Sequence, residues 1–263
     1  MRLKGKVALV TGSSAGVGEA IATVYAREGA LVMVHGMDPK EADTVAENIR
    51  RAGGTAASYA GNLEQTGVCE ALIAATVEKL GGINILVNNA AIKTRDNIDN
   101  VTEDGFDRTI AINLRAPMWT IKAAFPHFRK AGGGSILNIG SGNAYCGERT
   151  QLSYSISKAG LVTMTRNLAD AHGHEGIRVN LLNLGWVLTK NEYELKMKEG
   201  LAADWPTKVH PIYAPSGEIM KPEEIAHFAL MFVVPEGTRI NGSCVDLEQY
   251  PWVGRNPLKF TKE

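Results

Sequence analysis

Two residues one helical turn apart, Tyr154 and Lys158, could carry acid/base chemistry. A phenol has a pKa of about 10, and an ammonium group beside it favours the phenolate, so lowering that pKa by about 3 units takes roughly 4 kcal/mol. The phenol could then exchange a proton with a substrate hydroxyl. Apolar and small residues follow at helical spacing, which places both side chains on one helix face: Ala159, Gly160, Leu161, Val162, Met164, Leu168 and Ala169. Because Tyr-x-x-x-Lys also arises by chance, its meaning depends on the elements around it.

A glycine-rich turn, Thr11–Gly18, lies between a predicted strand at Val7–Val10 and a helix pattern that ends at Gly29. The short, continuous apolar run before the turn is typical of a central parallel strand. In this position backbone N–H groups can approach a pyrophosphate without obstruction by Cβ atoms. The spacing is Gly-x-x-x-Gly-x-Gly, which differs from the dinucleotide fingerprint Gly-x-Gly-x-x-Gly. We predict that the turn binds a cofactor through Gly12, Ser14, Gly16, Val17 and Gly18.

The end of the next predicted strand, Leu31–His35, bears on the identity of that cofactor. In dinucleotide-binding folds an acidic residue here binds the NAD ribose, whereas an arginine accepts the NADP phosphate. Gly36 and Met37 supply neither group, so the choice between NAD and NADP stays open. Asp38 could reach a ribose hydroxyl, but Asp38-Pro39-Lys40-Glu41 also reads as a helix N-cap with a first-turn proline and a capping box. Of these two roles for Asp38, we favour the cap.

Strands and helices alternate along the chain, which indicates one α/β domain over residues 1–263. The predicted strands are 7–10, 31–35, 55–60, 83–87, 135–139, 177–183 and 240–247. Asn62 follows the third strand, where its amide could face adenine, and a helix is predicted after it over about 64–80. The fourth strand ends in Asn88–Ala91, whose small side chains leave room for a ligand at the mouth of the sheet. Residues 190–221 are irregular and bear several aromatic residues, as expected of an active-site lid, and residues 248–263 form a tail without periodicity.

The balance of charges and the few cysteines limit the function classes. With 28 basic and 28 acidic residues, the chain has no net field to attract nucleic acid or an anionic membrane. Three widely spaced cysteines suit a reduced cytosolic protein better than a disulfide framework or a zinc site. His172 and His174 are two positions apart and point to different helix faces, so we expect no metal site. Because no apolar run approaches about 18 residues, we expect no signal peptide or membrane span and a soluble cytoplasmic protein.

Taken in order, these elements closely resemble the short-chain dehydrogenase/reductase family, from the first strand to about Leu247. The residues that carry the resemblance are Thr11 with Gly12, Gly16 and Gly18, then Asn88-Asn89-Ala90, Asn113, Ser141, Tyr154 with Lys158, and Arg178-Val179-Asn180. Each motif is weak alone, but the ordered set is very specific. The resemblance implies a doubly wound, Rossmann-type sheet of seven parallel strands with helices on both faces. It also implies hydride transfer between a nicotinamide cofactor and an alcohol or carbonyl.

The resemblance assigns a role to each matching residue. Tyr154 is the acid/base, and Lys158 lowers its pKa and holds the nicotinamide ribose. Ser141 hydrogen-bonds the substrate oxygen, and a helix distortion at Asn113 holds a water in the proton relay from Lys158. Further cofactor contacts are expected from Asn89, Ala90, Gly185, Val187 and Thr189.

The chain departs from the family pattern at four places. Asn62 replaces an aspartate after the third strand, and Ala91 replaces a frequent glycine. Leu184-Gly185 replaces Pro-Gly beside the nicotinamide, and Trp186 follows, so the pocket floor is expected to differ. Val245–Glu248 replaces the frequent Val-Asp-Gly-Gly, and the tail beyond it is longer than usual.

The function predicted is that of an NAD(P)-dependent secondary alcohol dehydrogenase or ketone reductase. The alternative is a non-catalytic, cofactor-sensing binding protein on the same fold, but such proteins usually lose the tyrosine or the lysine. The segments expected to line the pocket are polar, namely Lys93, Thr94, Arg95, Asn143, Glu148, Arg149 and Gln151. Polar linings favour a small substrate such as a sugar, a polyol or a hydroxy or keto acid, although a solvated rim is an equally good reading.

The helices predicted to carry Asn113 and Tyr154 are apolar on more than one side. Their apolar residues are Leu114, Met118, Trp119, Ile121, Ala123 and Phe125 on the first, and Ile156, Leu161, Val162, Met164 and Leu168 on the second. Surplus apolar faces on a soluble chain usually mark subunit interfaces. The resemblance implies that these helices pair about one twofold axis and the final strand about another, so we expect a homotetramer, with a dimer built on the two helices as the alternative.

Overall fold

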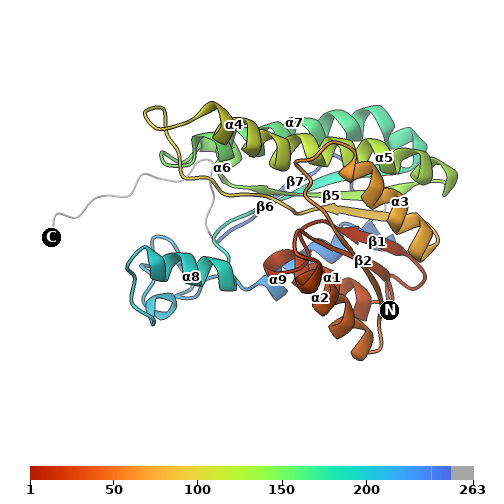
Figure 1. The fold of residues 1–263 in the computed structure, drawn as a ribbon, viewed down its shortest axis with the longest axis horizontal. Helices are drawn as coiled ribbons and strands as arrows, with labels where there is room; N and C mark the ends of the chain where they lie inside the picture. The colour runs from red at the N-terminus through yellow and green to blue at the C-terminus, as the bar shows by residue number, and fades with distance from the viewer. Residues whose placement is uncertain (238, 250–263) are drawn as a thin grey trace.

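A computed structural model describes residues 1–237 and 239–249 of the chain (Figure 1). In this part of the chain the strands are β1 Val7–Val10, β2 Leu31–Gly36, β3 Thr55–Ala60, β4 Ile85–Asn88, β5 Gly134–Ser141, β6 Ile177–Leu184 and β7 Cys244–Leu247. They pair in parallel in the order β3-β2-β1-β4-β5-β6-β7. The order reverses between β1 and β4, and crevices at such switch points are where doubly wound sheets bind ligands. The predicted fold is confirmed.

Helices cover both faces of the sheet (Figure 1). The α-helices are α1 Gly16–Arg27, α2 Pro39–Arg51, α3 Val68–Leu80, α4 Glu103–Ile110, α5 Ala116–Lys130, α6 Asn143–Cys146, α7 Leu152–His172, α8 Lys190–Lys198 and α9 Pro222–Met231. A π-helical turn spans Ala111–Arg115, and 3₁₀ turns span Gly173–Glu175, Trp205–Thr207 and Pro235–Gly237. No helix in the described ranges is long and apolar enough to cross a membrane.

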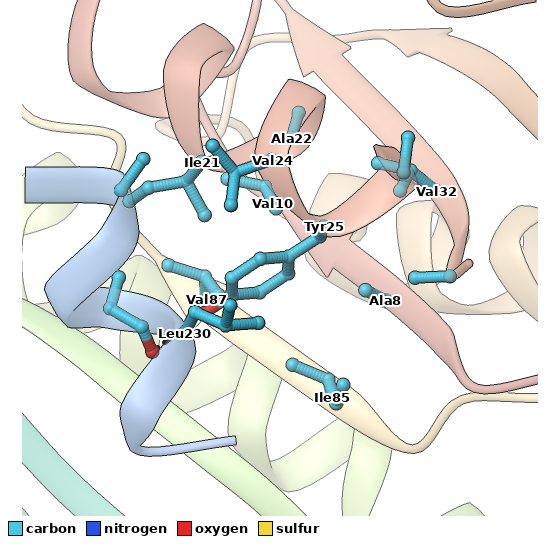
Figure 2. Packing of buried hydrophobic residues seen from close by; sticks show 14 of the residues in the cluster. Ala8, Val10, Ile21, Ala22, Val24, Tyr25, Val32, Ile85, Val87 and Leu230 are labelled. Atoms are coloured by element: carbon cyan, nitrogen blue, oxygen red, sulfur yellow. Dashed lines mark hydrogen bonds between the residues drawn. The ribbon is translucent and has the colours of Figure 1, made fainter. Parts of the chain in front are cut away.

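The two faces of the sheet bury separate apolar clusters. Because side chains alternate along a strand, Ala8 and Val10 of β1 pack with α1, α2 and α9, whereas Leu9 packs with α3, α5 and α7. Figure 2 shows the first cluster around Tyr25 of α1. Its ring is fully buried, and its hydroxyl donates to Ala229 O of α9 at 3.0 Å. The position of α1, which begins at the glycine-rich turn, is therefore fixed from both the sheet and α9.

The largest differences from the predicted elements occur at three places. Helix α3 begins at Val68, because Gly67 adopts a left-handed conformation (φ 84°) and residues before it form a turn. Strand β7 begins at Cys244 instead of residue 240, because Ile240 O accepts side-chain hydrogen bonds from Arg178 and Asn180. The lid, predicted to be irregular over 190–221, contains helix α8. Most of the predicted tail, residues 250–263, lies outside the described residues.

The surplus apolar faces of α5 and α7 are narrower than predicted. Ile121 and Phe125 of α5 are buried within the protomer, as are Leu161, Val162 and Met164 of α7. The exposed remainder is Met118 and Trp119 on α5 and Ile156 on α7. Helical periodicity could not separate the apolar residues buried within the protomer from the exposed ones, because each helix carries both kinds.

Candidate active site

A cavity of about 800 Å³ opens at the carboxyl edge of the sheet. It extends from the glycine-rich turn to helix α7 and the lid. Of the residues predicted to act or bind there, Val17, Asn89, Ser141, Tyr154, Lys158, Gly185, Val187 and Thr189 line it. Of the predicted polar lining, Lys93, Arg95, Asn143, Glu148 and Gln151 also reach it. Thr94 and Arg149 fall outside the set of lining residues, and Arg149 is exposed to solvent.

Helix α7 presents Tyr154 and Lys158 to the cavity one turn apart, as predicted. The Lys158 ammonium is almost fully buried, lies 5.5 Å from the centroid of the Tyr154 ring, and donates to Ile139 O of β5 at 2.8 Å. The start of the helix is held by Asp96, whose Oδ1 accepts from Ser153 N at 3.0 Å. A carboxylate at this end also complements the helix dipole. Asp96 therefore fixes the turn from which Tyr154 projects.

Burial sets the protonation states of the pair. It raises the pKa of Tyr154 to about 12, although a hydrogen bond with Ser141 lowers that pKa and the nearby Glu192 carboxylate raises it. Burial also lowers the pKa of Lys158 to about 8. Desolvation of the phenolate is the largest of these effects, and the lowering of the Tyr154 pKa by Lys158 stays a prediction. At neutral pH Tyr154 is protonated and placed to donate a proton.

The helix around Asn113 is distorted, as predicted, by the π-helical turn Ala111–Arg115. Asn113 is completely buried, and its amide binds the backbone of Ile92 at both atoms: Oδ1 accepts from N at 2.8 Å, and Nδ2 donates to O at 2.9 Å. Nδ2 also lies 3.1 Å from Ser157 Oγ on α7. Asn113 thus joins the loop after β4 to the helix of Tyr154. Its role in a proton relay stays a prediction.

Glycines let the glycine-rich turn pack closely against itself and against the residues that follow β4. A Cβ at Gly12 would lie 2.8 Å from Ala90 Cα, and one at Gly18 would lie 2.3 Å from Gly12 O. Asn89 closes the turn against β4, because its Nδ2 donates to the carbonyls of Thr11 and Gly12, each at 2.9 Å.

Helix α1 begins at Gly16 without a side-chain cap, since its N-cap residue is Ala15. The first N–H groups of α1 therefore point toward the cavity end without a side-chain acceptor, which is the arrangement that binds a phosphate. Gly16 also approaches the lid, where a Cβ would lie 3.3 Å from Thr189 Cγ2. These residues fit the pyrophosphate and nicotinamide half of a dinucleotide.

The residues predicted for the adenosine half already serve local structure. Asp38 caps α2, accepting from Lys40 N at 2.7 Å and Glu41 N at 3.4 Å, as we favoured. The Glu41 carboxylate does not complete the predicted capping box and instead lies 3.5 Å from Ser14 Oγ. Asn62 Oδ1 accepts from Glu64 N at 3.0 Å, which leaves the amide nitrogen as the group that could face adenine.

The lid adds Glu192 and Lys196, which the sequence motifs did not single out, beside Trp186, which was expected to alter the pocket floor. Trp186 stacks on Trp205, with ring centroids 5.5 Å apart, and its Nε1 donates to Glu192 Oε1 at 2.9 Å. Glu192, Lys196 and Trp186 all line the cavity. The aromatic content of 190–221 was the available signal, but the pattern did not say which of its side chains would face the active site.

A parallel doubly wound sheet with an uncapped helix after β1 and a serine–tyrosine–lysine set at its carboxyl edge defines a dinucleotide-dependent oxidoreductase. The model of the short chain dehydrogenase family matches residues 6–200, and the chain belongs to this family. An uncharacterized oxidoreductase of Thermotoga maritima is 33% identical over 249 residues, which cover 94% of this chain and 98% of that protein. The D-threitol dehydrogenase of Mycolicibacterium smegmatis is 32% identical over 242 residues, which cover 92% of this chain and 91% of that protein. A solved structure of a Serratia marcescens short-chain dehydrogenase/reductase variant is 30% identical, with a TM-score of 0.83 over 94% of this chain and 98% of that one.

Proposed function

We propose that the protein transfers a hydride between NAD(P) and a secondary alcohol or ketone on a small polar substrate, such as a sugar, a polyol or a hydroxy or keto acid. The proposal is carried by one observation: Ser141, Tyr154 and Lys158 line one cavity, which also reaches Val17 of the glycine-rich turn. Bound NAD(P) supplies or accepts the hydride. The polar lining supports the class of substrate.

The protein's part is to grip the substrate oxygen and move a proton. In the reductive direction the Tyr154 hydroxyl gives its proton to the carbonyl oxygen as that oxygen gains negative charge. Ser141 donates a hydrogen bond to the same oxygen, and fixed donors of this kind stabilise developing charge strongly. In the oxidative direction Tyr154 takes the alcohol proton. Lys158 holds the nicotinamide ribose, and Asn113 keeps the backbone of Ile92 and helix α7 in register.

The glycine-rich turn and the cavity wall divide the cofactor contacts. The backbone around Gly12, Gly16 and Gly18 and the uncapped start of α1 hold the pyrophosphate. Gly185, Val187 and Thr189, which line the cavity, lie on the nicotinamide side. We propose that NAD and NADP are accepted with similar efficiency, since the position after β2 carries neither an acidic side chain nor a guanidinium at Gly36 or Met37.

We also propose a homotetramer in the cytoplasm. The exposed Met118, Trp119 and Ile156 support a contact between copies through α5 and α7. Exposed Phe228 and Met231 on α9 give the last helix an apolar face as well. Light scattering at micromolar concentration tests the assembly, and a mass near the 28.3 kDa of one chain would refute it. The three cysteines are free, which suits a reducing compartment.

The experiment that tests the activity follows NADH and NADPH absorbance over a panel of aldehydes, ketones, sugars and keto acids, with the reverse reaction on the alcohols. Turnover of a carbonyl compound with either cofactor supports the proposal. Tight cofactor binding by equilibrium dialysis, with no turnover across the panel, would overturn it in favour of a cofactor-sensing protein.

A further inference from the structure

The outer half of the cavity carries three basic side chains, Lys93, Arg95 and Lys196. Each already has an acidic partner within the protein. Lys93 Nζ lies 3.7 Å from Glu192 Oε2. Glu199 serves the other two, because its Oε1 accepts from Arg95 Nη2 and its Oε2 accepts from Lys196 Nζ, each at 2.7 Å. A substrate carboxylate would use the same two-oxygen arrangement to bind this pair of cations.

Glu199 is the C-cap residue of helix α8 and does not itself line the cavity. Its hydrogen bond with Lys196 and the charge of Arg95 hold its pKa below the ordinary value, so it is ionised at neutral pH. The side chains of Arg95 and Lys196 are 42% and 17% exposed, respectively. Both cations line the cavity, and the Glu199 carboxylate, itself 32% exposed, partly offsets their charge.

We propose that Glu199 is a built-in counter-ion that makes the cavity select neutral sugars or polyols over hydroxy and keto acids of similar size. This inference rests on the proposed hydride transfer and narrows its substrate class. A substrate carboxylate entering the cavity loses water and needs a cation to compensate. Arg95 and Lys196 keep N–H donors free for a second acceptor, but Glu199 offsets their charge, so they compensate a substrate carboxylate only weakly. A neutral polyol needs no such compensation.

The carboxylates on the cavity wall also favour neutral sugars or polyols as substrates. Glu192 lies near enough to Tyr154 to raise its pKa, and it is held there by Trp186 Nε1. In a 2-hydroxy or 2-keto acid the carboxylate is bonded directly to the reacting carbon, so it would stand close to Glu192 and be repelled by it. Glu148, also on the wall, already accepts from Gln151 Nε2 at 2.8 Å. Carboxylate and amide groups of this kind accept hydrogen bonds from substrate hydroxyls.

The test compares neutral and acidic substrates matched in length, namely polyols with aldonic acids of equal carbon number. It measures kcat/KM for each pair in the wild-type protein and in Glu199→Gln, which keeps the shape of the side chain and removes its charge. The wild-type protein should favour the neutral member by about tenfold or more. In Glu199→Gln the acid's kcat/KM should rise by about tenfold, with that of the neutral member nearly unchanged.

Glu194→Gln is the matched control, since Glu194 lies on the same helix with its Oε1 3.9 Å from the exposed Lys190. It should leave the ratio of the two substrates unchanged. The gain of acid activity in Glu199→Gln should also shrink with added salt, which a loss of lid order would not produce. A wild-type preference for acids, or an unchanged ratio in Glu199→Gln with an unaltered unfolding midpoint, would overturn the inference. Absence of turnover with every substrate and both cofactors would instead reject the proposed hydride transfer.

Discussion

Asn183 of β6 fixes the backbone that carries Ser141, because its Oδ1 accepts from Ser141 N at 3.0 Å. The other end of this amide donates to Tyr145 Oη and to Asp246 Oδ1, both at 2.9 Å. Tyr145 Oη also donates to Asp246 Oδ1 at 3.0 Å. Asn183 is completely buried, and a Cβ at neighbouring Gly140 would lie 2.2 Å from its Oδ1. The end of β7 thus helps to hold the end of β5, where the substrate oxygen is expected to bind.

Replacing Asn183 should therefore impair the reaction more than its distance from the substrate suggests. In Asn183→Ala the amide of Ser141 loses its acceptor, and Ser141 can move relative to Tyr154. Small misplacements of a catalytic group cost up to about a hundredfold, so we expect kcat to fall between about tenfold and a hundredfold. Steady-state kinetics measure kcat, and cofactor titration should show an affinity close to that of the wild-type protein.

Asn180→Ala is the matched control for this prediction. Asn180 is also completely buried on β6, but its amide binds Ile240 O and Ser243 N, away from Ser141. Both variants should lose stability to a similar extent, about 1–3 kcal/mol for a buried group left unpaired. If Asn180→Ala lowered kcat as much as Asn183→Ala, the effect would be one of stability and the positioning role would be wrong.

Tyr154→Phe removes the proposed acid/base while keeping the ring. Loss of a general acid or base costs about 10²–10⁴-fold, so kcat should fall by that factor with cofactor binding retained. Retention of more than about a tenth of the wild-type kcat would rule out the assignment. In the wild-type protein the raised pKa of Tyr154 also predicts that alcohol oxidation speeds up as the pH rises, since oxidation requires the phenolate.

The sheet was predictable because its signals are local. Continuous apolar runs marked the buried strands, and Asp38 with Pro39 marked the start of α2, which the structure confirms. The error at the start of β7 arose where side chains of β6 bind the backbone in place of strand pairing. Ile240 looked like the start of a strand, but its carbonyl is bound by the side chains of Arg178 and Asn180.

The inner part of the site was likewise predictable, because Tyr154 and Lys158 are fixed by a helical repeat. The outer part was not. Arg95 and Glu199 are 104 positions apart, and only the placement of the lid brings them together. The role of Asn183 could not be predicted either, because its hydrogen-bond partners lie on other elements and not near it in the sequence. These contacts join elements that are far apart in the sequence, and periodicity carries no information on them.

Met37 offers a test of where the adenosine lies. Its side chain is 62% exposed just after β2, whereas a Cβ at Gly36 would lie 2.7 Å from Ser14 Cβ, so only position 37 can carry a longer side chain. Met37→Arg should raise the kcat/KM ratio of NADPH to NADH by about tenfold, or about 1.4 kcal/mol, because a guanidinium binds a phosphate with two hydrogen bonds. Met37→Gln supplies bulk without charge and should not change the ratio. An unchanged ratio in Met37→Arg would place the ribose elsewhere.

His35 links the glycine-rich turn to the loop after β3. Its Nδ1 accepts from Gly12 N at 3.1 Å, and its Nε2 lies 3.1 Å from Gly61 O. The first contact requires an unprotonated Nδ1, so the ring is neutral with its proton on Nε2. His35 is 2% exposed, and burial lowers its pKa to about 4. Between about pH 4 and pH 6.5, therefore, the His35 imidazole is neutral in the folded protein. In the unfolded chain, where the histidine pKa is about 6.5, it is protonated.

The free energy of unfolding should therefore decrease as the pH falls through the window between these two pKa values. The unfolded state binds more protons there, so stability rises with pH, and His35 alone should account for about 2 kcal/mol between about pH 7.5 and pH 5. Urea unfolding at both pH values measures the difference. In His35→Asn an amide oxygen can still accept from Gly12 N but cannot titrate, so this variant should lose most of that pH dependence. His174→Asn, at an exposed position, serves as the control and should keep it. An equally steep loss of stability with acid in His35→Asn would mean that other groups, and not the histidine behind the cofactor turn, destabilise the fold at low pH.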